Sequence, residues 1–252
     1  MAVPQTSDIL REVIFAPLEH GGRAQVIFDR LRNAVALDVF KDGEQLPPET
    51  ELAAQMGISP VTLRDAIRLM REAGLLETRR GRTGGSFVRR NGYDAVAHGD
   101  SLLDGMSLVD LRDLSDWRIS VSEASSWLAA ERASDDEIEA MAQHVRHFVE
   151  AGNSATARRA EGRLYIAVAA ASQSVRLTRA TVACVIDYGP MLSVAYRDAA
   201  LRDRVAREHT SLLAAINEGA SADAALAVRR SGVDVATILA GSKISSRAGS
   251  RK

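Results

Sequence analysis

Cysteine, aromatic residues and long apolar runs are all scarce in this chain of 252 residues. The single cysteine, Cys184, excludes an intramolecular disulfide and a cysteine-based zinc site. No apolar run reaches the roughly 18 residues that a membrane-spanning helix needs, and the first residues lack the basic start and apolar stretch of a signal peptide. The sequence therefore predicts a cytoplasmic protein with no membrane partner.

Alanine, leucine, arginine and glutamate are abundant instead, and these residues lose little side-chain freedom in a helix. The formal net charge of −1 indicates no partner by itself. The distribution of charge is more informative, because positions 79–90 carry arginines at 79, 80, 82, 89 and 90 and no acidic residue. The composition thus predicts a mainly helical protein with one basic segment.

The first third of the chain has the pattern of three helices followed by a hairpin. Apolar residues recur at helical spacing over 23–40, and a short second helix over ETELAAQM ends at Gly57. Ser59 and Pro60 are a natural N-cap and first residue for a third helix over 60–73. Two short alternating segments, LLETRR and GSFVRR, flank a glycine-rich tip and predict a β-hairpin. Together these parts predict a winged helix-turn-helix.

The outward face of the third helix and the basic hairpin are the expected DNA-contacting surfaces. The Arg64 guanidinium matches a guanine edge, whereas the hydroxyls of Ser59 and Thr62 suit phosphate oxygens. The hairpin arginines would follow the DNA backbone or enter a minor groove. The residues expected to contact DNA are Ser59, Val61, Thr62, Arg64, Arg68, Arg79, Arg80, Gly81 and Arg82. The alternative is an ordinary three-helix bundle with a solvated arginine face.

The segment LPPETELAAQMGISPVTLRDAIRLMREAGLLETRRGRTGGSFV resembles the DNA-binding domain of the GntR family of transcriptional regulators almost end to end. Thr50 and Pro60 stand where many members carry arginine, so the resemblance does not extend to the operator sequence. It implies that the family's operator-contacting positions are occupied here by Ser59, Thr62, Arg64, Arg80 and Gly81.

From Leu108 onward the helical signal is nearly continuous, with predicted helices over 108–133, 135–150, 155–172, 175–198, 202–218 and 221–240. These helices predict an antiparallel all-α bundle as the second domain. The expected division of the chain is an N-terminal arm over 1–20, the DNA-binding domain over 21–90, a glycine-containing linker over 91–106, the helical domain over 107–240 and a disordered tail over 241–252.

Two segments of this half, LRDLSDWRISVSEASSWLAAERA and EHTSLLAAINEGASADA, resemble the C-terminal effector domain of the FadR subfamily. Many members of that subfamily bind a divalent metal through an aspartate and three histidines. The corresponding residues here are Glu161, Tyr165, His209 and Ser231, of which only His209 is unchanged. Tyrosine and serine are poor neutral ligands, so we expect neither a metal nor another cofactor.

Arg118 corresponds to a family arginine that points into the effector cavity. A buried arginine needs an anionic partner, which is either Glu161 or an anionic effector. The effector that this chemistry favours is a small organic acid or acyl compound, bound by Arg118, Glu161, Tyr165, His209 and Ser231. A purely structural ion pair or a surface arginine is the alternative.

The combined prediction is a homodimeric regulator, taken as a repressor, that binds a double-stranded DNA operator and responds to a small effector. One alternative is a ligand-independent or nucleoid-type DNA-binding protein, for which the helical core would be closed. Another is an enzyme built on the helical domain, but the sequence contains no GxxxxGK[ST], GxSxG or HExxH motif.

Overall fold

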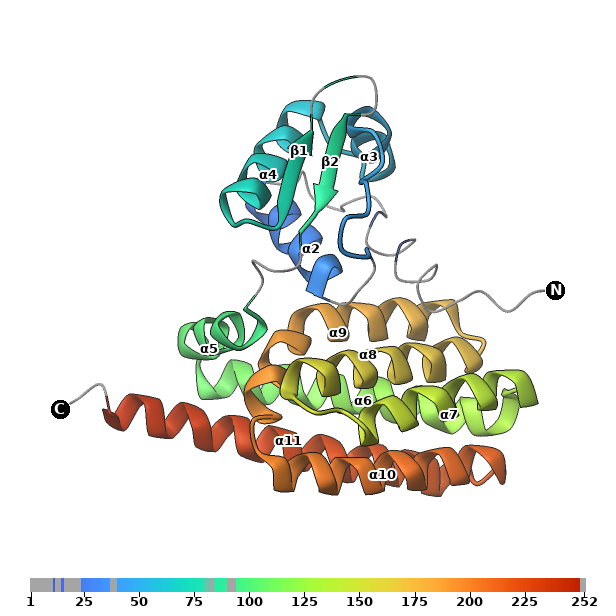
Figure 1. Cartoon of the computed structure of the whole chain (residues 1–252). Helices are drawn as coiled ribbons and strands as arrows, with labels where there is room; N and C mark the ends of the chain where they lie inside the picture. Colours follow the sequence, from blue (N-terminus) through green and yellow to red (C-terminus); the bar gives the residue numbers. More distant parts are fainter. Residues whose placement is uncertain are drawn as a thin grey trace. The chain divides into compact units, whose positions relative to one another are not determined.

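The chain divides into two units, Met1–Asp94 and Ala95–Lys252, which are considered separately (Figure 1). No helix among the described residues combines the length and the apolar character that crossing a membrane requires. The computed structural model describes residues 11, 15, 24–36, 40–79, 81, 84–89 and 94–249.

The first unit consists of helices followed by a two-stranded antiparallel sheet, as the sequence predicts. In the sheet Leu76 pairs with Val88 and Arg79 with Gly85, so the hairpin is in register over its whole length. The core is formed by apolar side chains of every element, including Ile27, Leu52, Leu63 and Val88. The elements are α2 (Ala24–Ala36), α3 (Glu49–Gln55), α4 (Pro60–Glu72), β1 (Leu76–Arg79) and β2 (Gly85–Val88).

Helix α4 begins and packs as its sequence dictates. Ser59 is the N-cap and accepts a hydrogen bond from the Thr62 amide, while Pro60 occupies the first helical position, where no amide is needed. The buried face is the one expected from helical spacing, with Leu63, Ala66, Ile67 and Met70 inside. The opposite face and the N-terminus of α4 therefore remain exposed.

The second unit is all-helical, and its helices stack side by side in Figure 1. Two apolar clusters fill its interior, one around Tyr188 and Leu201 and the other around Met141 and Leu164. Capping boxes begin α6 at Ser107 and α7 at Ser134. The helices are α5 (Ala95–Gly105), α6 (Leu108–Arg132), α7 (Asp135–Val149), α8 (Ser154–Ala171), α9 (Val175–Ala195), α10 (Ala199–Asn217) and α11 (Ser221–Gly249).

The linker expected over 91–106 is wrong for most of its length, because residues 95–105 form helix α5. Gly99 allows α5 to approach α9 closely, since a Cβ atom there would lie 2.3 Å from the Pro190 carbonyl oxygen. Asp100 pairs with Arg197 at the same junction. Gly99, which suggested a linker in the sequence, is the point at which α5 and α9 pack closely.

The disordered tail expected from residue 241 is likewise corrected, because α11 continues to Gly249. Lys243 anchors this extension, although it is a charged residue in a serine-rich segment. Its side chain is buried, and its ammonium group donates hydrogen bonds to the carbonyl oxygens of Leu103 at 2.7 Å and Asp104 at 3.3 Å. Those carbonyls end α5, where a helix favours a positive charge.

Candidate functional site

The N-terminus of α4 presents polar and exposed side chains at the position expected of a DNA-reading helix. The hydroxyl groups of Ser59 and Thr62 lie 2.7 Å apart, and Ser59 Oγ is 3.1 Å from the Thr62 amide nitrogen that donates to it. Val61 beside them is 64% exposed. An uncovered helix N-terminus with amides and hydroxyls is suited to phosphate oxygens.

Two arginines on the outer face of α4 are held by exposed carboxylates. Arg64 Nε lies 3.3 Å from Glu49 Oε2 of α3, and Arg68 Nη1 lies 2.7 Å from Glu72 Oε1. Exposed ion pairs contribute little stability, so either arginine can exchange its partner for a nucleic-acid group at small cost.

The hairpin holds Arg79 between two partners, since its guanidinium pairs with Glu77 and lies 4.3 Å above the centre of the Phe87 ring. Gly81 has a φ of +110°, a conformation that favours glycine, and none of the described residues beyond its chain neighbours would lie within 4 Å of a Cβ atom placed there. Arg80 and Arg82 lie outside the described residues, so their predicted DNA contacts stay predictions.

A buried ion pair lies at the centre of the second unit. Arg118 Nη2 of α6 is 2.8 Å from Glu161 Oε1 of α8, and both side chains are at least nine-tenths buried. His209 of α10 is fully enclosed beside them, with its Nε2 atom 3.8 Å from the same carboxylate oxygen. The arginine expected to face an anion therefore has Glu161 as its partner.

Aromatic rings enclose the ion pair. The Arg118 guanidinium carbon lies 5.4 Å from the centre of the Tyr165 ring and 5.0 Å from that of Tyr188. The Tyr165 hydroxyl is 3.2 Å from Ser231 Oγ. The structure thus gathers all five residues expected at the effector site, namely Arg118, Glu161, Tyr165, His209 and Ser231.

Sequence reasoning missed Tyr188 and Tyr196, whose side chains are also buried in this region. No local pattern in the sequence indicated this, although three of the chain's four tyrosines, Tyr165, Tyr188 and Tyr196, lie here. Burial raises the pKa of Tyr196, and the nearby Glu161 charge adds to the shift. Both phenols are therefore neutral hydrogen-bonding groups at physiological pH.

The electrostatics of this buried polar cluster favour neutral groups around the single ion pair. Burial lowers the pKa of His209 to about 3, and the Arg118 charge adds to that shift. Burial also raises the pKa of Glu161, against the attraction of Arg118. Among the described residues, neither ring nitrogen of His209 has a hydrogen-bond partner, and the Tyr196 hydroxyl lies near the Glu161 carboxylate without a well-formed hydrogen bond to it. The ring nitrogens can satisfy a polar ligand.

Two family models match the chain, and together they cover most of both units. The model described as "Bacterial regulatory proteins, gntR family" matches residues 23–88, and the one described as "FCD domain" matches residues 113–231. The chain belongs to the GntR family. Its FCD domain contains the buried polar cluster described above.

Proteins with similar sequences are named as transcriptional regulators. A putative HTH-type transcriptional regulator, RmpR of Mycobacterium gastri, is 34% identical over 67% of this chain. An HTH-type transcriptional regulator of Mycobacterium tuberculosis is 28% identical over 62% of the chain. The chain spans only 62% and 63%, respectively, of these relatives' own lengths. Both relatives are named as regulators of transcription rather than as enzymes.

Solved structures show the same fold. A GntR family member from Pseudomonas syringae pv. tomato aligns over 97% of this chain and 98% of its own, with 18% identity and a TM-score of 0.50. The E. coli protein McbR/YncC aligns over 87% of this chain and 98% of its own, with 16% identity and a TM-score of 0.52. Both resemblances concern the fold alone.

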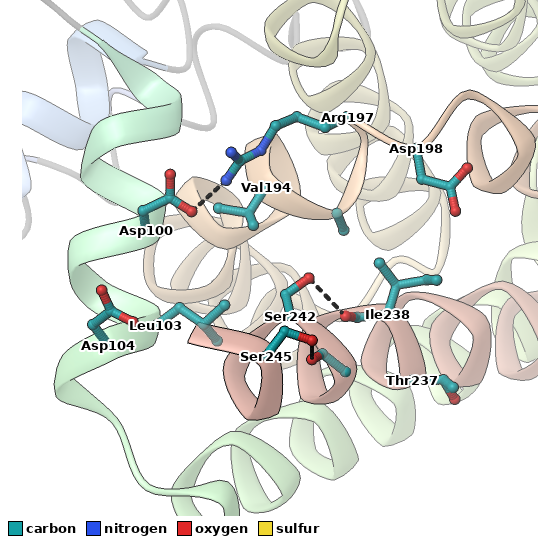
Figure 2. Close-up of a pocket in the computed structure, with 12 residues that line it drawn as sticks. Asp100, Leu103, Asp104, Val194, Arg197, Asp198, Thr237, Ile238, Ser242 and Ser245 are labelled. Atoms are coloured by element: carbon teal, nitrogen blue, oxygen red, sulfur yellow. Dashed lines mark hydrogen bonds and ion pairs between the residues drawn. The ribbon is translucent and has the colours of Figure 1, made fainter. Parts of the chain in front are cut away.

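A separate surface pocket of about 780 Å³ lies between α5, the end of α9 and α11 of the FCD-containing unit (Figure 2). Figure 2 shows the Asp100–Arg197 pair on one side of it and Ser242 and Ile238 of α11 on another. None of the five residues expected to bind an effector lines this pocket.

The metal site of FadR-type relatives does not fit this GntR-family chain. Glu161 and His209 are the only strong donors of the four corresponding residues, and the Arg118 guanidinium already occupies Glu161. A dication would have to bind beside that positive charge with Tyr165 and Ser231 as neutral oxygen donors, which is unfavourable.

We therefore predict that the purified protein contains no stoichiometric divalent metal after dialysis. Elemental analysis of the protein measures this directly. A stoichiometric metal that only a chelator removes, with a fall in melting temperature on removal, would contradict the prediction.

A second prediction concerns protonation of His209. An unfolded histidine has a pKa near 6.5, whereas the folded value is about 3. The stability contributed by the neutral ring is therefore complete above about pH 6.5 and is lost as the pH falls toward 3. An NMR titration of the imidazole resonances, with His209→Gln for assignment, should show His209 still neutral at pH 5. A midpoint near 6.5 would show that the ring is solvated.

Proposed function

We propose that the protein is a homodimeric, sequence-specific DNA-binding regulator of transcription, controlled by a small effector bound in its FCD domain. The observation that carries the DNA-binding half is the uncovered N-terminus of α4, where Val61 is exposed and the Ser59 and Thr62 hydroxyls lie side by side. This helix belongs to the segment that the GntR model matches.

In the proposed complex the N-terminus of α4 enters the major groove of the operator. Ser59 and Thr62 bind phosphate oxygens, and Arg64 leaves Glu49 to form two hydrogen bonds with a guanine. Arg79 and its neighbours in the hairpin follow the DNA backbone. Because these phosphate contacts release counterions, the affinity falls as salt rises.

A single recognition helix reads only a few base pairs, so the proposed operator has two closely spaced half-sites related by a two-fold axis. A homodimer matches that symmetry. Repression is the proposed outcome, since a dimer bound to its operator excludes other proteins from the same DNA.

The buried polar cluster is the proposed effector site, and the effector is a small organic acid or acyl compound. Support comes from the two buried ring nitrogens of His209, which have no hydrogen-bond partner among the described residues and which a ligand with hydroxyl and carboxyl groups can satisfy. A carboxylate must share the Arg118 guanidinium with Glu161 or displace it. To regulate, the effector must bind DNA-competent and DNA-incompetent dimers with different affinities.

Replacing Arg64 by alanine tests the DNA-binding half. Arg64→Ala should weaken operator binding by about 1–3 kcal/mol and relax the preference at one base pair, because the base-reading guanidinium is lost. The matched control is Arg71→Ala, which removes an exposed arginine at the opposite end of α4. Binding at fixed salt is measured on the operator and on single-base variants of it. Unchanged affinity and preference in Arg64→Ala would refute this placement of α4.

The effector half is tested by a thermal-shift screen of organic acids, because a ligand of the native state raises the melting temperature. Calorimetry with the acid that the screen returns is then repeated on Tyr165→Phe and His209→Gln. Both variants should bind at least tenfold more weakly, whereas Thr210→Ala, an exposed neighbour on α10, should not. Unchanged binding by both site variants would show that the effector site lies elsewhere. A preference for a neutral ligand would refute the proposal that the effector is an organic acid.

A further inference from the structure

The pocket between α5, α9 and α11 is large enough for a small organic molecule. Its volume of about 780 Å³ lies within the usual range for ligand pockets, and Leu103, Val194 and Ile238 give it apolar surface. Gly241 lines it without a side chain, and a Cβ atom there would have no described atom within 4 Å beyond its own helix. The pocket therefore has open space beside apolar groups.

Acidic side chains line this pocket on two sides. Asp100 and Asp104 lie about one turn apart on α5, whereas Asp198 precedes α10 (Figure 2). Among the described residues of the lining, Arg197 is the one basic side chain, and Asp100 already holds its guanidinium. The lining therefore carries more negative than positive charge, and its carboxylates come from two different helices.

A further positive charge lies at the C-terminal end of α5, outside the lining. The Lys243 ammonium group is buried and donates to the carbonyl oxygens of Leu103 and Asp104. It offsets part of the acidic excess, but Lys243 is not among the residues that line the pocket. A net negative charge therefore remains, even when this lysine is counted.

The hydroxyl groups of the lining are placed to accept hydrogen bonds rather than to donate them. Each donates its own proton to a carbonyl oxygen of α11, at 2.8 Å from Thr237 and at 3.0 Å from both Ser242 and Ser245. Their lone pairs stay available, and carboxylates only accept. A ligand that donates hydrogen bonds and carries positive charge matches this lining, whereas an anion would meet an arginine that is already paired.

We propose that this pocket binds an aliphatic diamine. One ammonium group lies beside the carboxylates of α5, the other lies beside Asp198, and the hydrocarbon chain between them covers Val194 and Ile238. Alkyl ammonium groups keep their protons at neutral pH, as lysine does. None of the five residues of the proposed effector site lines this pocket, and the ligand is opposite in charge to the acid proposed there.

The bound diamine joins α5 to the rest of the helical unit. Helix α5 begins at Ala95, directly after Asp94, the last residue of the first unit. A ligand shared by the carboxylates of α5 and by Asp198 holds α5 against the neighbouring helices. The pocket thus gives a second small molecule a hold on the helix that follows the DNA-binding unit.

Three linear molecules of similar length test the charge preference: hexanediamine, hexanediol and hexanedioate. Each is titrated into the full-length protein in a calorimeter without DNA, so the result is independent of operator binding. We expect the diamine to bind at the pocket, with an affinity that falls as salt rises, because the carboxylates are partly exposed. No binding of the diamine overturns the proposal, as does binding of the diol or the dioate that Gly241→Leu abolishes.

Substitutions locate the site. Gly241→Leu places a side chain in the pocket and should abolish diamine binding, while leucine favours the helix. Asp198→Asn keeps an N-cap residue but removes one charge, and should weaken binding about fivefold. Asp203→Asn, exposed further along α10 and outside the lining, is the matched control and should bind normally. Undiminished binding by Gly241→Leu, or equal losses in Asp198→Asn and Asp203→Asn, overturns the proposal.

Hydrogen exchange tests the contact with α5. At saturating hexanediamine the amides of α5 should exchange more slowly than in the free protein, because the ligand holds this helix in place. The same concentration of diamine should leave α5 unchanged in Gly241→Leu. Exchange in α5 that the diamine does not slow, or slows equally in Gly241→Leu, overturns the proposal.

Discussion

Arg118 and Glu161 lie 2.8 Å apart in the interior of the FCD domain, and both charges have been removed from water. Removing either charge from water costs several kcal/mol, and the close pairing offsets that cost. The rings of Tyr165 and Tyr188 cover the guanidinium. Since the loss of one partner would leave the other charge buried and unpaired, α6 and α8 have to assemble around this pair.

This pair also determines the chemistry of its surroundings. The positive charge of Arg118 adds to burial in keeping His209 neutral, and it disfavours a metal ion beside Glu161 and His209. A site whose fixed charges already cancel has no net attraction for an anion. An organic acid bound at the proposed effector site would therefore have to compete with Glu161 for Arg118, and its affinity would depend on the free energy of separating that ion pair.

The sequence was sufficient for features determined by neighbouring residues. Ser59 and Pro60 predict the beginning of α4, and the alternating segments around a glycine-rich tip predict the hairpin. The sequence did not predict elements whose stability depends on a contact with a residue far away in the chain. Helix α5 is stable because Gly99 fits against Pro190, and α11 is extended because Lys243 reaches the end of α5. The convergence of three tyrosines on one ion pair is likewise a property of the packed bundle, which no local pattern shows.

The contact between Lys243 and Leu103 also has a consequence for synthesis of the chain. These residues are 140 positions apart, so at about 5–20 residues per second roughly 7–28 seconds separate their addition on the ribosome. Domains generally fold as units, and the DNA-binding unit ends by Asp94. During that interval the first unit is already synthesised while the second still lacks the end of α11, so α5 cannot gain its Lys243 contact until nearly the whole chain has been made.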